Sequence, residues 1–292
     1  MKILIIGGSS HIGYDLCKIL SEHHQIISIC RKPVFYHNQN NISCVLSDLD
    51  NVFKIINDIR PDIVVNCIGY SDVQECSRFD ATAMNVNFYF VQKLVDCVLR
   101  NDIKLIHFSS SHVFDGENSP YDEDSLVCPI NIYGETKAKA DEYIKSRLKK
   151  YIIIRLTSVV KNCEYFQRKL LVNIVLDKLN RGEITKLVND KFTNYVHIDD
   201  VVCCCRELIF LQCNGIYNIA GDKVYSPYSL CKGLIRNESD IDLLQSVSSQ
   251  EFFHGFESSH SSGKLILSNL KIKKELNVKF NDIDDVLRKM VK

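Results

Sequence analysis

The chain has 292 residues, of which 46% are hydrophobic and 25% charged, with 12 Gly and only 5 Pro. These values are typical of a globular protein and exclude disordered, collagen-like and coiled-coil chains. The 36 Lys and Arg residues balance 36 Asp and Glu residues, so no overall field attracts nucleic acid or an anionic membrane. No apolar run approaches the roughly 18 residues that cross a bilayer, and the apolar start at 3–6 is too short for a signal-peptide core. We therefore expect a cytoplasmic protein without nucleic-acid or membrane partners.

The 13 cysteines do not indicate a disulfide scaffold. They are scattered along the chain or grouped in the apolar run 201–205, and no C-x-x-C pair is present to hold zinc or to run redox chemistry. In a reducing compartment such cysteines act as small hydrophobic residues that fill the core. We expect no metal site.

Strands alternate with helices along the first half of the chain. The apolar run at 2–6 predicts a buried strand that ends in a glycine turn, and a helix follows this turn. The same patterns predict strands at about 25–30, 42–46, 62–68, 103–109 and 151–157, and helices at about 50–59, 80–100 and 131–149. Because the strands are apolar rather than two-sided, this order predicts an α/β fold: a doubly wound parallel sheet of the Rossmann type with helices on both faces.

The pattern weakens after residue 157. Helices are predicted near 164–181, 199–212 and 282–291, and short strands near 185–188 and 215–219. We expect residues 1–157 to form the Rossmann domain, completed by about 195–212. Residues 158–292 are expected to form mainly a smaller α/β substrate-binding lobe, because ligands of such sheets bind at the carboxyl ends of the strands.

The turn after the first strand has the residue types of a dinucleotide site. A glycine turn between strand and helix lets backbone N–H groups meet a pyrophosphate, and a glycine at the end of the turn allows close packing of helix on sheet. Here Ser10 stands where the middle glycine is usual. The alternative is a tight turn with no ligand. We expect cofactor contacts from Gly7, Ser9, Ser10, His11, Ile12 and Gly13.

The ends of the next strands indicate which dinucleotide binds. An acidic residue after the second strand would favour NAD, but the chain has Arg31 and Lys32 there, which favours NADP, unless both are solvated loop cations. After the third strand, Asp48 could accept from an adenine amino group while Leu49 covers the ring, or Asp48 could cap a helix. We also place Cys67, Ile68 and Gly69 among the cofactor contacts.

Ser110, Tyr133 and Lys137 are the candidate catalytic residues. Tyr133 and Lys137 are four apart, so they share one face of the predicted helix. An ammonium group near the phenol favours the phenolate, and so lowers the pKa of the tyrosine from about 10 toward neutral pH. The Ser110 hydroxyl, at the end of the neighbouring strand, can donate to a carbonyl oxygen that becomes an alkoxide. The alternative is an exposed Tyr and Lys on a polar helix.

These residues lie in a longer stretch that resembles the extended short-chain dehydrogenase/reductases, in particular the dTDP-4-dehydrorhamnose reductase-like group. The resemblance covers residues 1–220 well and the remainder loosely. Its most specific parts are residues 109–116, 120–124 and Pro129-x-Asn131-x-Tyr133-Gly134-x-x-Lys137. Residues 60–67, Asn85-Val86-Asn87 and 190–200 are also similar. It implies an NADPH-dependent reductase of a 4-keto sugar linked to a nucleotide, with Ser110, Tyr133 and Lys137 catalytic. It also implies that Asn85, Tyr133 and Lys137 contact the cofactor and that Ser111, His112 and Phe114 contact the substrate.

Three departures from the family pattern leave other functions open. Ser10 replaces the middle glycine, the Arg-Pro pair that the family carries near the C-terminus is missing, and His112 stands where rhamnose-type reductases carry Tyr. One alternative is therefore a non-catalytic, NADP-binding regulatory subunit that resembles the beta subunit of methionine adenosyltransferase. Another is an epimerase and reductase in which His112 moves a proton next to the ketone. A homodimer is a further possibility.

Overall fold

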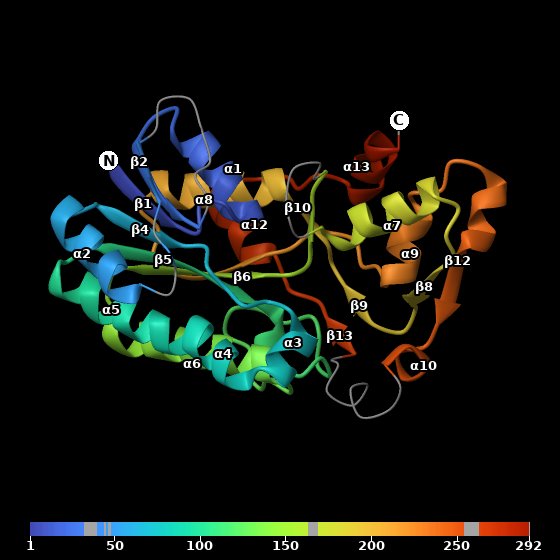
Figure 1. Cartoon of the computed structure of the whole chain (residues 1–292), viewed down its shortest axis with the longest axis horizontal. Coiled ribbons are helices and arrows are strands. Elements are labelled where there is room, and N and C mark those ends of the chain that lie inside the picture. Colours follow the sequence, from blue (N-terminus) through green and yellow to red (C-terminus); the bar gives the residue numbers. More distant parts are fainter. Residues whose placement is uncertain (32–39, 44, 46–47, 163–168, 254–262, 292) are drawn as a thin grey trace. The chain divides into compact units, whose positions relative to one another are not determined.

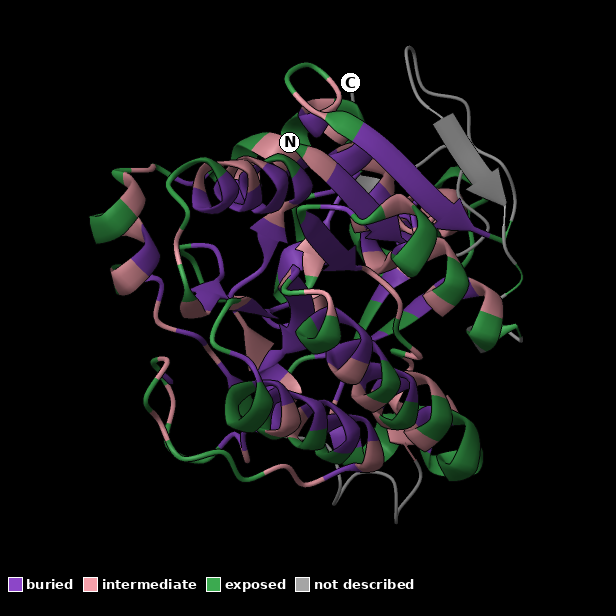
Figure 2. Ribbon diagram, turned by 90° about the vertical axis from the view of Figure 1, so that its left-hand side faces the viewer, coloured by how far each residue is buried: buried purple, intermediate pink, exposed green. Residues whose placement is uncertain are grey.

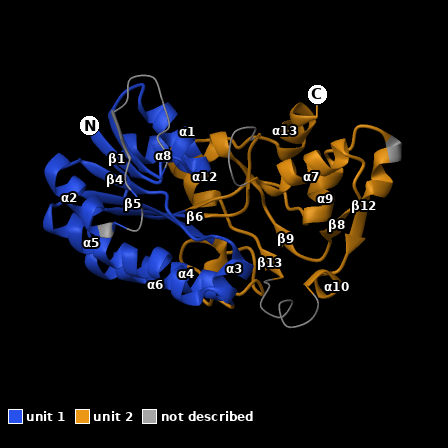
Figure 3. Cartoon of the chain, in the orientation of Figure 1, with its two compact units in different colours: residues 1–110, 131–155, 202–217 blue, residues 111–130, 156–201, 218–292 orange. Residues whose placement is uncertain are grey.

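The computed structural model describes residues 1–31, 40–43, 45, 48–162, 169–253 and 263–291. The chain divides into two compact units (Figure 3). Unit 1 comprises residues 1–110, 131–155 and 202–217, and unit 2 comprises residues 111–130, 156–201 and 218–292. Each unit thus combines segments that are far apart in the sequence.

A seven-stranded sheet carries unit 1, with the strand order β11-β6-β5-β4-β1-β2-β3. The strands are β1 (Lys2–Ile6), β2 (Gln25–Cys30), β3 (Asn40–Ser43), β4 (Ile63–Asn66), β5 (Lys104–Ser110), β6 (Tyr151–Leu156) and β11 (Gly215–Ile219). The pairs β3–β2, β2–β1, β1–β4 and β4–β5 are parallel. The order runs outward from β1 in both directions, which confirms the predicted doubly wound sheet.

Helices cover both faces of this sheet (Figure 1). They are α1 (His11–Leu20), α2 (Leu49–Ile59), α5 (Phe90–Arg100), α6 (Ile132–Arg147) and α8 (Ile198–Phe210). Apolar residues of α2, α5 and α6 join Leu4, Val64 and Leu105 of the sheet in one buried cluster. Helices α1 and α8 lie on the opposite face. Because both faces are covered, the central strands are almost entirely buried (Figure 2), as their continuous apolar runs indicate.

The predicted helix at 80–100 contains an irregular turn. It consists of α4 (Asp80–Met84), a π turn at Asn85–Tyr89 and α5. The buried side chain of Asn87 connects this turn to neighbouring segments. Its Oδ1 accepts from the Tyr70 N–H, and its Nδ2 donates to the Thr136 hydroxyl. Hydrophobic periodicity detects the helix but not the extra residue that widens one turn.

Two predicted boundaries differ from the structure. β3 spans Asn40–Ser43 and begins before the predicted residue 42, because its pairing with β2 runs from Ile27 opposite Asn40 to Cys30 opposite Ser43; residues 44 and 46–47 lie outside the described part. Helix α7 (Leu171–Asn180) begins later than the predicted residue 164. Leu170, which precedes it, has extended backbone angles, and residues 163–168 lie outside the described part.

Unit 2 is built from short elements. Its strands β8 (Thr185–Val188), β9 (Phe192–Thr193) and β10 (Val196–His197) pair in parallel with β12 (Leu244–Val247), β13 (Lys264–Leu265) and β7 (Val159–Val160). Its helices are α7, α9 (Pro227–Lys232), α10 (Ser249–Phe253), α12 (Leu270–Leu276) and α13 (Ile283–Met290). Apolar residues of α7, α9 and α13 form its core with Tyr195 and Leu244. Unit 2 is therefore an α/β unit, and its segments differ from the single predicted range 158–292, because residues 111–130 belong to unit 2 and residues 202–217 to unit 1.

Most described cysteines fill the core, as expected. Seven of the eleven free cysteines in the described part of the chain are buried, while Cys128 is exposed. Cys44 and Cys163 lie outside the described residues. In the described ranges, no helix combines the length and the apolar character that a membrane crossing requires.

Candidate functional site

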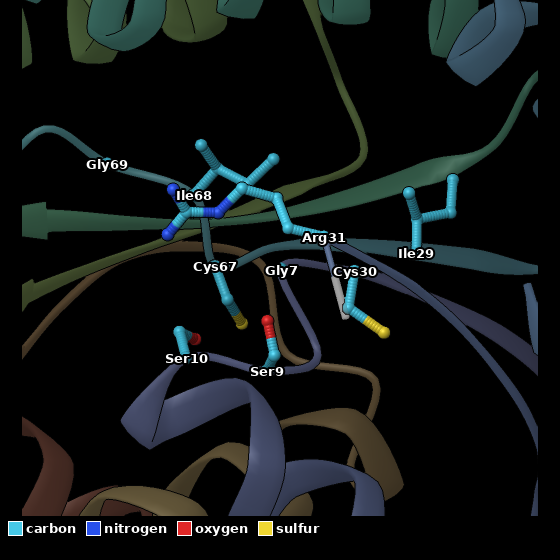
Figure 4. A pocket seen from close by; sticks show the side chains of 9 residues that line it. All are labelled: Gly7, Ser9, Ser10, Ile29, Cys30, Arg31, Cys67, Ile68 and Gly69. Atoms are coloured by element: carbon cyan, nitrogen blue, oxygen red, sulfur yellow. The ribbon is translucent and has the colours of Figure 1, made fainter. Parts of the chain in front are cut away.

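The glycine turn between β1 and α1 borders a pocket in unit 1. Gly7 has a φ of +90°, which glycine adopts without strain. A Cβ atom at Gly13 would lie 2.2 Å from the Gly7 carbonyl oxygen, so only glycine permits this close approach. The pocket is lined by Gly7, Ser9, Ser10, Ile29, Cys30, Arg31, Cys67, Ile68 and Gly69 (Figure 4). These residues lie at the ends of β1, β2 and β4, where the strand order reverses and such sheets bind dinucleotides.

Ser10 has a structural reason to replace the usual glycine. It is the N-cap of α1, and its Oγ accepts a hydrogen bond from the Gly13 N–H at 3.1 Å. Serine is a favoured N-cap because its hydroxyl satisfies an N–H that has no partner within the helix. His11 and Ile12 begin the same helix. The N-terminus of α1 therefore lies beside the pocket, in the arrangement that binds phosphate groups.

Arg31 lies on the rim of the pocket. It follows the last residue of β2 and is exposed. Figure 4 shows its side chain extending toward Ile68. A guanidinium group at this strand end is suited to a phosphate on the 2′-hydroxyl of a dinucleotide, because charge-assisted hydrogen bonds to phosphate are strong. Lys32, the second predicted cation, lies outside the described residues.

Asp48 adopts the capping role that was one of its two predicted alternatives. Its Oδ1 accepts from the Asn51 N–H at 3.0 Å and caps α2. Leu49 is the first residue of α2, and its side chain lies outside the described part. Contact between either residue and an adenine ring stays a prediction.

Tyr133 lies in the first turn of α6. This helix begins at the N-cap Asn131, whose Oδ1 accepts from the Gly134 N–H at 2.8 Å. Tyr133 is 9% exposed and packs with Cys76 and Ala83, from α3 (Val73–Arg78) and α4. These apolar residues pack on the ring of Tyr133, and its hydroxyl is the polar group of the side chain. Tyr133 is thus held firmly rather than displayed on a polar helix surface.

Lys137 is buried one turn further along α6. Its Nζ donates to the Phe108 carbonyl oxygen at 2.5 Å and lies 3.2 Å from Nε2 of His107, both on β5. Burial lowers the pKa of Lys137 to about 8, and the Asp141 carboxylate partly opposes this shift. A solvated surface lysine, which was the alternative interpretation, is therefore excluded.

A buried ion pair lies beside Lys137. Asp141 Oδ2 accepts from the Ser109 hydroxyl at 2.9 Å and from Arg155 Nε at 3.3 Å. Burial raises the pKa of Asp141, and the charges of Arg155 and Lys137 oppose the shift. Asp141 Oδ1 is buried without a hydrogen-bond partner among the described residues. Sequence analysis missed this pair, although Asp141 continues the four-residue spacing from Tyr133 through Lys137.

The serines and His112 follow directly from β5. Ser110 is its buried last residue, and Ser111 begins a 3-10 helix that ends at Val113. Burial lowers the pKa of His112 to about 4, so its ring is neutral at physiological pH. Ser110 lies at the carboxyl end of β5, the same strand whose Phe108 carbonyl accepts a hydrogen bond from Lys137.

Phe114, which is expected to contact the substrate, is a buried residue, and that contact stays a prediction. Its side chain has no exposed surface. The ring stacks on Tyr121 with a centroid distance of 4.2 Å and an interplanar angle of 6°. The Tyr121 hydroxyl in turn accepts from the Gly116 N–H at 2.9 Å. Phe114 therefore packs the segment after β5, where Tyr121 covers one face of its ring and no part of the residue is exposed.

Asn87 is the buried asparagine that sequence analysis missed. Asn85, predicted to contact the cofactor, is exposed at the start of the π turn, and its contact stays a prediction. Asn87 is 1% exposed, and its Nδ2 donates to Thr136 on α6 at 3.0 Å. The stretch Asn85-Val86-Asn87 contains both residues, but only the packing of the π turn decides which one faces α6.

Unit 1 thus combines two kinds of chemistry at the carboxyl ends of its strands. The pocket has backbone N–H groups, a helix N-terminus and a cation, which together fit a dinucleotide phosphate. Helix α6 adds a phenol and a buried amine beside the strand that ends in Ser110. A phenol acid, an amine and a hydroxyl donor are suited to proton transfer at a carbonyl oxygen.

Comparisons with known proteins agree with this arrangement. The whole chain, residues 1–292, matches the family described as RmlD substrate binding domain. A dTDP-4-dehydrorhamnose reductase of Aggregatibacter actinomycetemcomitans is 27% identical over 157 residues, 53% of this chain and 50% of that protein. The chain therefore spans about half the length of this relative. The beta subunit of methionine adenosyltransferase 2 from Rattus norvegicus is 27% identical over 241 residues, 78% of this chain and 70% of that protein.

Solved structures share the fold. The dTDP-4-dehydrorhamnose reductase of Bacillus anthracis in complex with NADP has a TM-score of 0.84 at 19% identity. The superposition covers 99% of this chain and 98% of that one. At this identity the likeness shows the fold, and the functional argument depends on the site itself.

Proposed function

Because the chain belongs to the RmlD substrate binding domain family, whose model matches residues 1–292, we propose that it is an NADPH-dependent reductase of a 4-keto sugar linked to a nucleotide. The observation that carries this proposal is the placement of Tyr133 and the buried Lys137 on α6, with Lys137 anchored to β5 close to Ser110. The fold alone would support many reactions, whereas this combination of groups supports proton transfer to a carbonyl oxygen.

NADPH fits the residues of the pocket. The glycine turn, Ser9, Ser10 and the start of α1 would hold its pyrophosphate, and Arg31 with Lys32 would hold its 2′-phosphate. Asp48 and Leu49 would border the adenine, and Cys67, Ile68, Gly69 and Asn85 would complete the contacts. A Cβ at Gly13 would fill the space in which the turn approaches the helix, which supports a site that needs glycine. The bound cofactor supplies the hydride that reduces the ketone carbon.

Side chains of unit 1 then transfer a proton to the carbonyl oxygen. Tyr133 donates its phenolic proton to the carbonyl oxygen as that oxygen gains charge, and Ser110 donates a hydrogen bond to the same oxygen. The Lys137 ammonium favours the phenolate that remains and so lowers the pKa of Tyr133. We further propose that Lys137 contacts the nicotinamide ribose and that residues 158–292, with Ser111 and His112, supply most contacts to the sugar nucleotide.

A regulatory, non-catalytic role is the second candidate. The observation that favours it is the 27% identity to the rat beta subunit of methionine adenosyltransferase 2 over 78% of this chain. The retained Ser110, Tyr133 and Lys137 favour the reductase, because a regulatory subunit has no need of a buried amine beside a tyrosine.

One experiment separates the two functions. The protein is incubated with NADPH and a panel of nucleotide-linked 4-keto-6-deoxy sugars while the absorbance of the reduced cofactor is followed. We expect turnover with at least one sugar, and Tyr133→Phe should lower the rate at least 10²-fold, since a positioned acid contributes about 10²–10⁴. Tyr133→Phe should bind NADPH nearly as tightly as the wild type, whereas Lys137→Ala should lose both binding and turnover. NADPH binding without turnover of any sugar would favour the regulatory role.

A further inference from the structure

Lys137 shares its buried position with a second titratable side chain, His107, which the mechanism above does not use. Nζ of Lys137 lies 3.2 Å from Nε2 of His107. On the other side of the ring, Nδ1 lies 3.1 Å from Nδ2 of Asn66, the last residue of β4. All three side chains are buried. They form a row from β4 across β5 to α6.

The backbone of Ile68 determines how the Asn66 amide is oriented. The Ile68 N–H donates to Asn66 Oδ1 at 3.2 Å. A backbone N–H can only donate, so the amide oxygen faces Ile68 and the amide nitrogen faces His107. Because an amide NH2 group can only donate as well, Nδ1 of His107 is the acceptor. A neutral imidazole whose Nδ1 accepts carries its single proton on Nε2.

The Nε2–H of His107 therefore points at Nζ of Lys137. A neutral amine has a lone pair that accepts this hydrogen, whereas an ammonium group has only N–H bonds to offer. We propose that His107, held by Asn66 in the Nε2–H tautomer, is a positioning residue that favours the neutral amine of Lys137. This inference deepens the proposed reductase function and rests on it, because the Lys137 ammonium assists Tyr133 in that reaction and His107 lowers the pH at which the ammonium is lost.

The surrounding charges are consistent with this role. His107 on β5 lies against Lys137, and the Asp141 carboxylate on α6, which pairs with Arg155 on β6, acts on Lys137 by its charge; Tyr133 lies one turn earlier on α6. Burial, and then the charge of Lys137, lower the pKa of His107 well below its usual value, so the ring stays neutral. Burial lowers the pKa of Lys137 to about 8. His107 and burial act on Lys137 in the same direction, and Asp141 acts against them.

The tautomer can be measured without any substrate. Nitrogen-15 NMR of histidine-labelled protein separates the Nε2–H tautomer, the Nδ1–H tautomer and the imidazolium by the shifts of the two ring nitrogens. Loss of a signal in His107→Gln assigns this ring among the 9 histidines. We expect the Nε2–H tautomer between pH 6 and 9. Either the Nδ1–H tautomer or an imidazolium in the wild type would overturn the proposal.

Asn66→Asp reverses the arrangement with little change in shape. A carboxylate accepts both from the Ile68 N–H and from the ring, so His107 should change to the Nδ1–H tautomer and present a lone pair to the Lys137 ammonium. The pKa of Lys137 should then rise by at least one unit, measured from the carbon-13 shift of its Cε during a pH titration and assigned with Lys137→Arg. In the proposed reaction, the fall of kcat/KM at high pH should move upward by the same amount.

A double-mutant cycle separates the tautomer from the added charge. In a His107→Leu background, Asn66→Asp should raise the pKa of Lys137 by less than half as much as in the wild type. An equal shift in both backgrounds would show that the new carboxylate acts by its charge alone, and would overturn the proposal. If Asn66→Asp does not fold, the tautomer of His107 measured in the wild type still tests the proposal. If no sugar is reduced, the reductase function is refuted, while the NMR measurements still test the role of His107.

Discussion

Asp141 on α6 and Arg155 on β6 form an ion pair that is almost completely buried, with side chains 3% and 2% exposed. The pair lies one helical turn beyond Lys137, and the Asp141 carboxylate raises the pKa of Lys137 against the effect of burial. The Asp141 carboxylate therefore has two effects: it pairs α6 with β6, and it raises the pKa of Lys137, an amine of the proposed active site.

Replacing Asp141 should move the pH dependence of the reductase. Tyr133 is assisted by the ammonium form of Lys137, whose pKa is lowered to about 8 by burial, so activity should fall as the pH rises through about 8. Asp141→Asn removes a charge that raises this pKa. The fall in kcat/KM should therefore occur at a lower pH than in the wild type.

The same substitution should also destabilise the protein, by about 3–5 kcal/mol, because it leaves a buried Arg155 without this carboxylate. Thermal unfolding followed by circular dichroism measures that loss and shows whether the fold is retained. Glu142→Gln is the matched control, since Glu142 is the next residue on α6 and its side chain is 72% exposed. An unchanged or higher pH for the fall in activity would contradict the assignment of Lys137.

Arg31 should determine the preference for NADPH. Each charge-assisted hydrogen bond to the 2′-phosphate is worth about 1.5–3 kcal/mol, so the double variant Arg31→Ala with Lys32→Ala should narrow the preference for NADPH over NADH by at least tenfold. Titration of both cofactors into both proteins measures it. Lys93→Ala, a change of an exposed cation on α5, should leave the preference unchanged. Equal affinities of the wild type for the two cofactors would refute the assignment.

Gly13→Ala should disturb both stability and cofactor binding. The new Cβ would lie 2.2 Å from the Gly7 carbonyl oxygen and 2.9 Å from Ser10 Oγ, so the turn must move. Overpacking of this kind costs about 1–3 kcal/mol, and we expect NADPH affinity to fall more than tenfold. Gly69→Ala is the control for stability, because its Cβ would only reach an ordinary contact of 3.7 Å with Asn87. Wild-type affinity in Gly13→Ala would argue against a cofactor at this turn.

His112 should not exchange protons with the substrate. Burial lowers its pKa to about 4, and a base this weak is a poor acceptor for a proton on carbon. The reaction run in D₂O with a 4-keto sugar should give a product without solvent deuterium at carbon 3 or carbon 5, by mass spectrometry. Deuterium that appears with the wild type and disappears with His112→Ala would instead establish epimerisation before reduction. His112→Gln tests whether a neutral hydrogen-bonding side chain preserves substrate affinity.

The sequence by itself determined the elements of the Rossmann sheet and the position of the glycine turn. The apolar runs at 2–6 and 25–30 coincide with β1 and β2, because a strand buried on both faces must be apolar throughout. The spacing of Gly7 and Gly13 identified the turn, because no side chain fits where the helix approaches. The separation of Tyr133 and Lys137 placed them on one helix face, since that relationship is local.

Only the tertiary structure decided which groups surround those residues. His107 lies 30 residues before Lys137 in the chain, and Thr136 lies 49 residues after Asn87. No periodicity records such contacts, because they depend on how α6 and the π turn pack against β5. The same holds for Phe114, whose stacking on Tyr121 no spacing in the sequence records. A sequence pattern states which side chains a helix or strand carries, whereas burial and hydrogen-bond partners are set by the neighbouring element, and these govern the charge of Lys137.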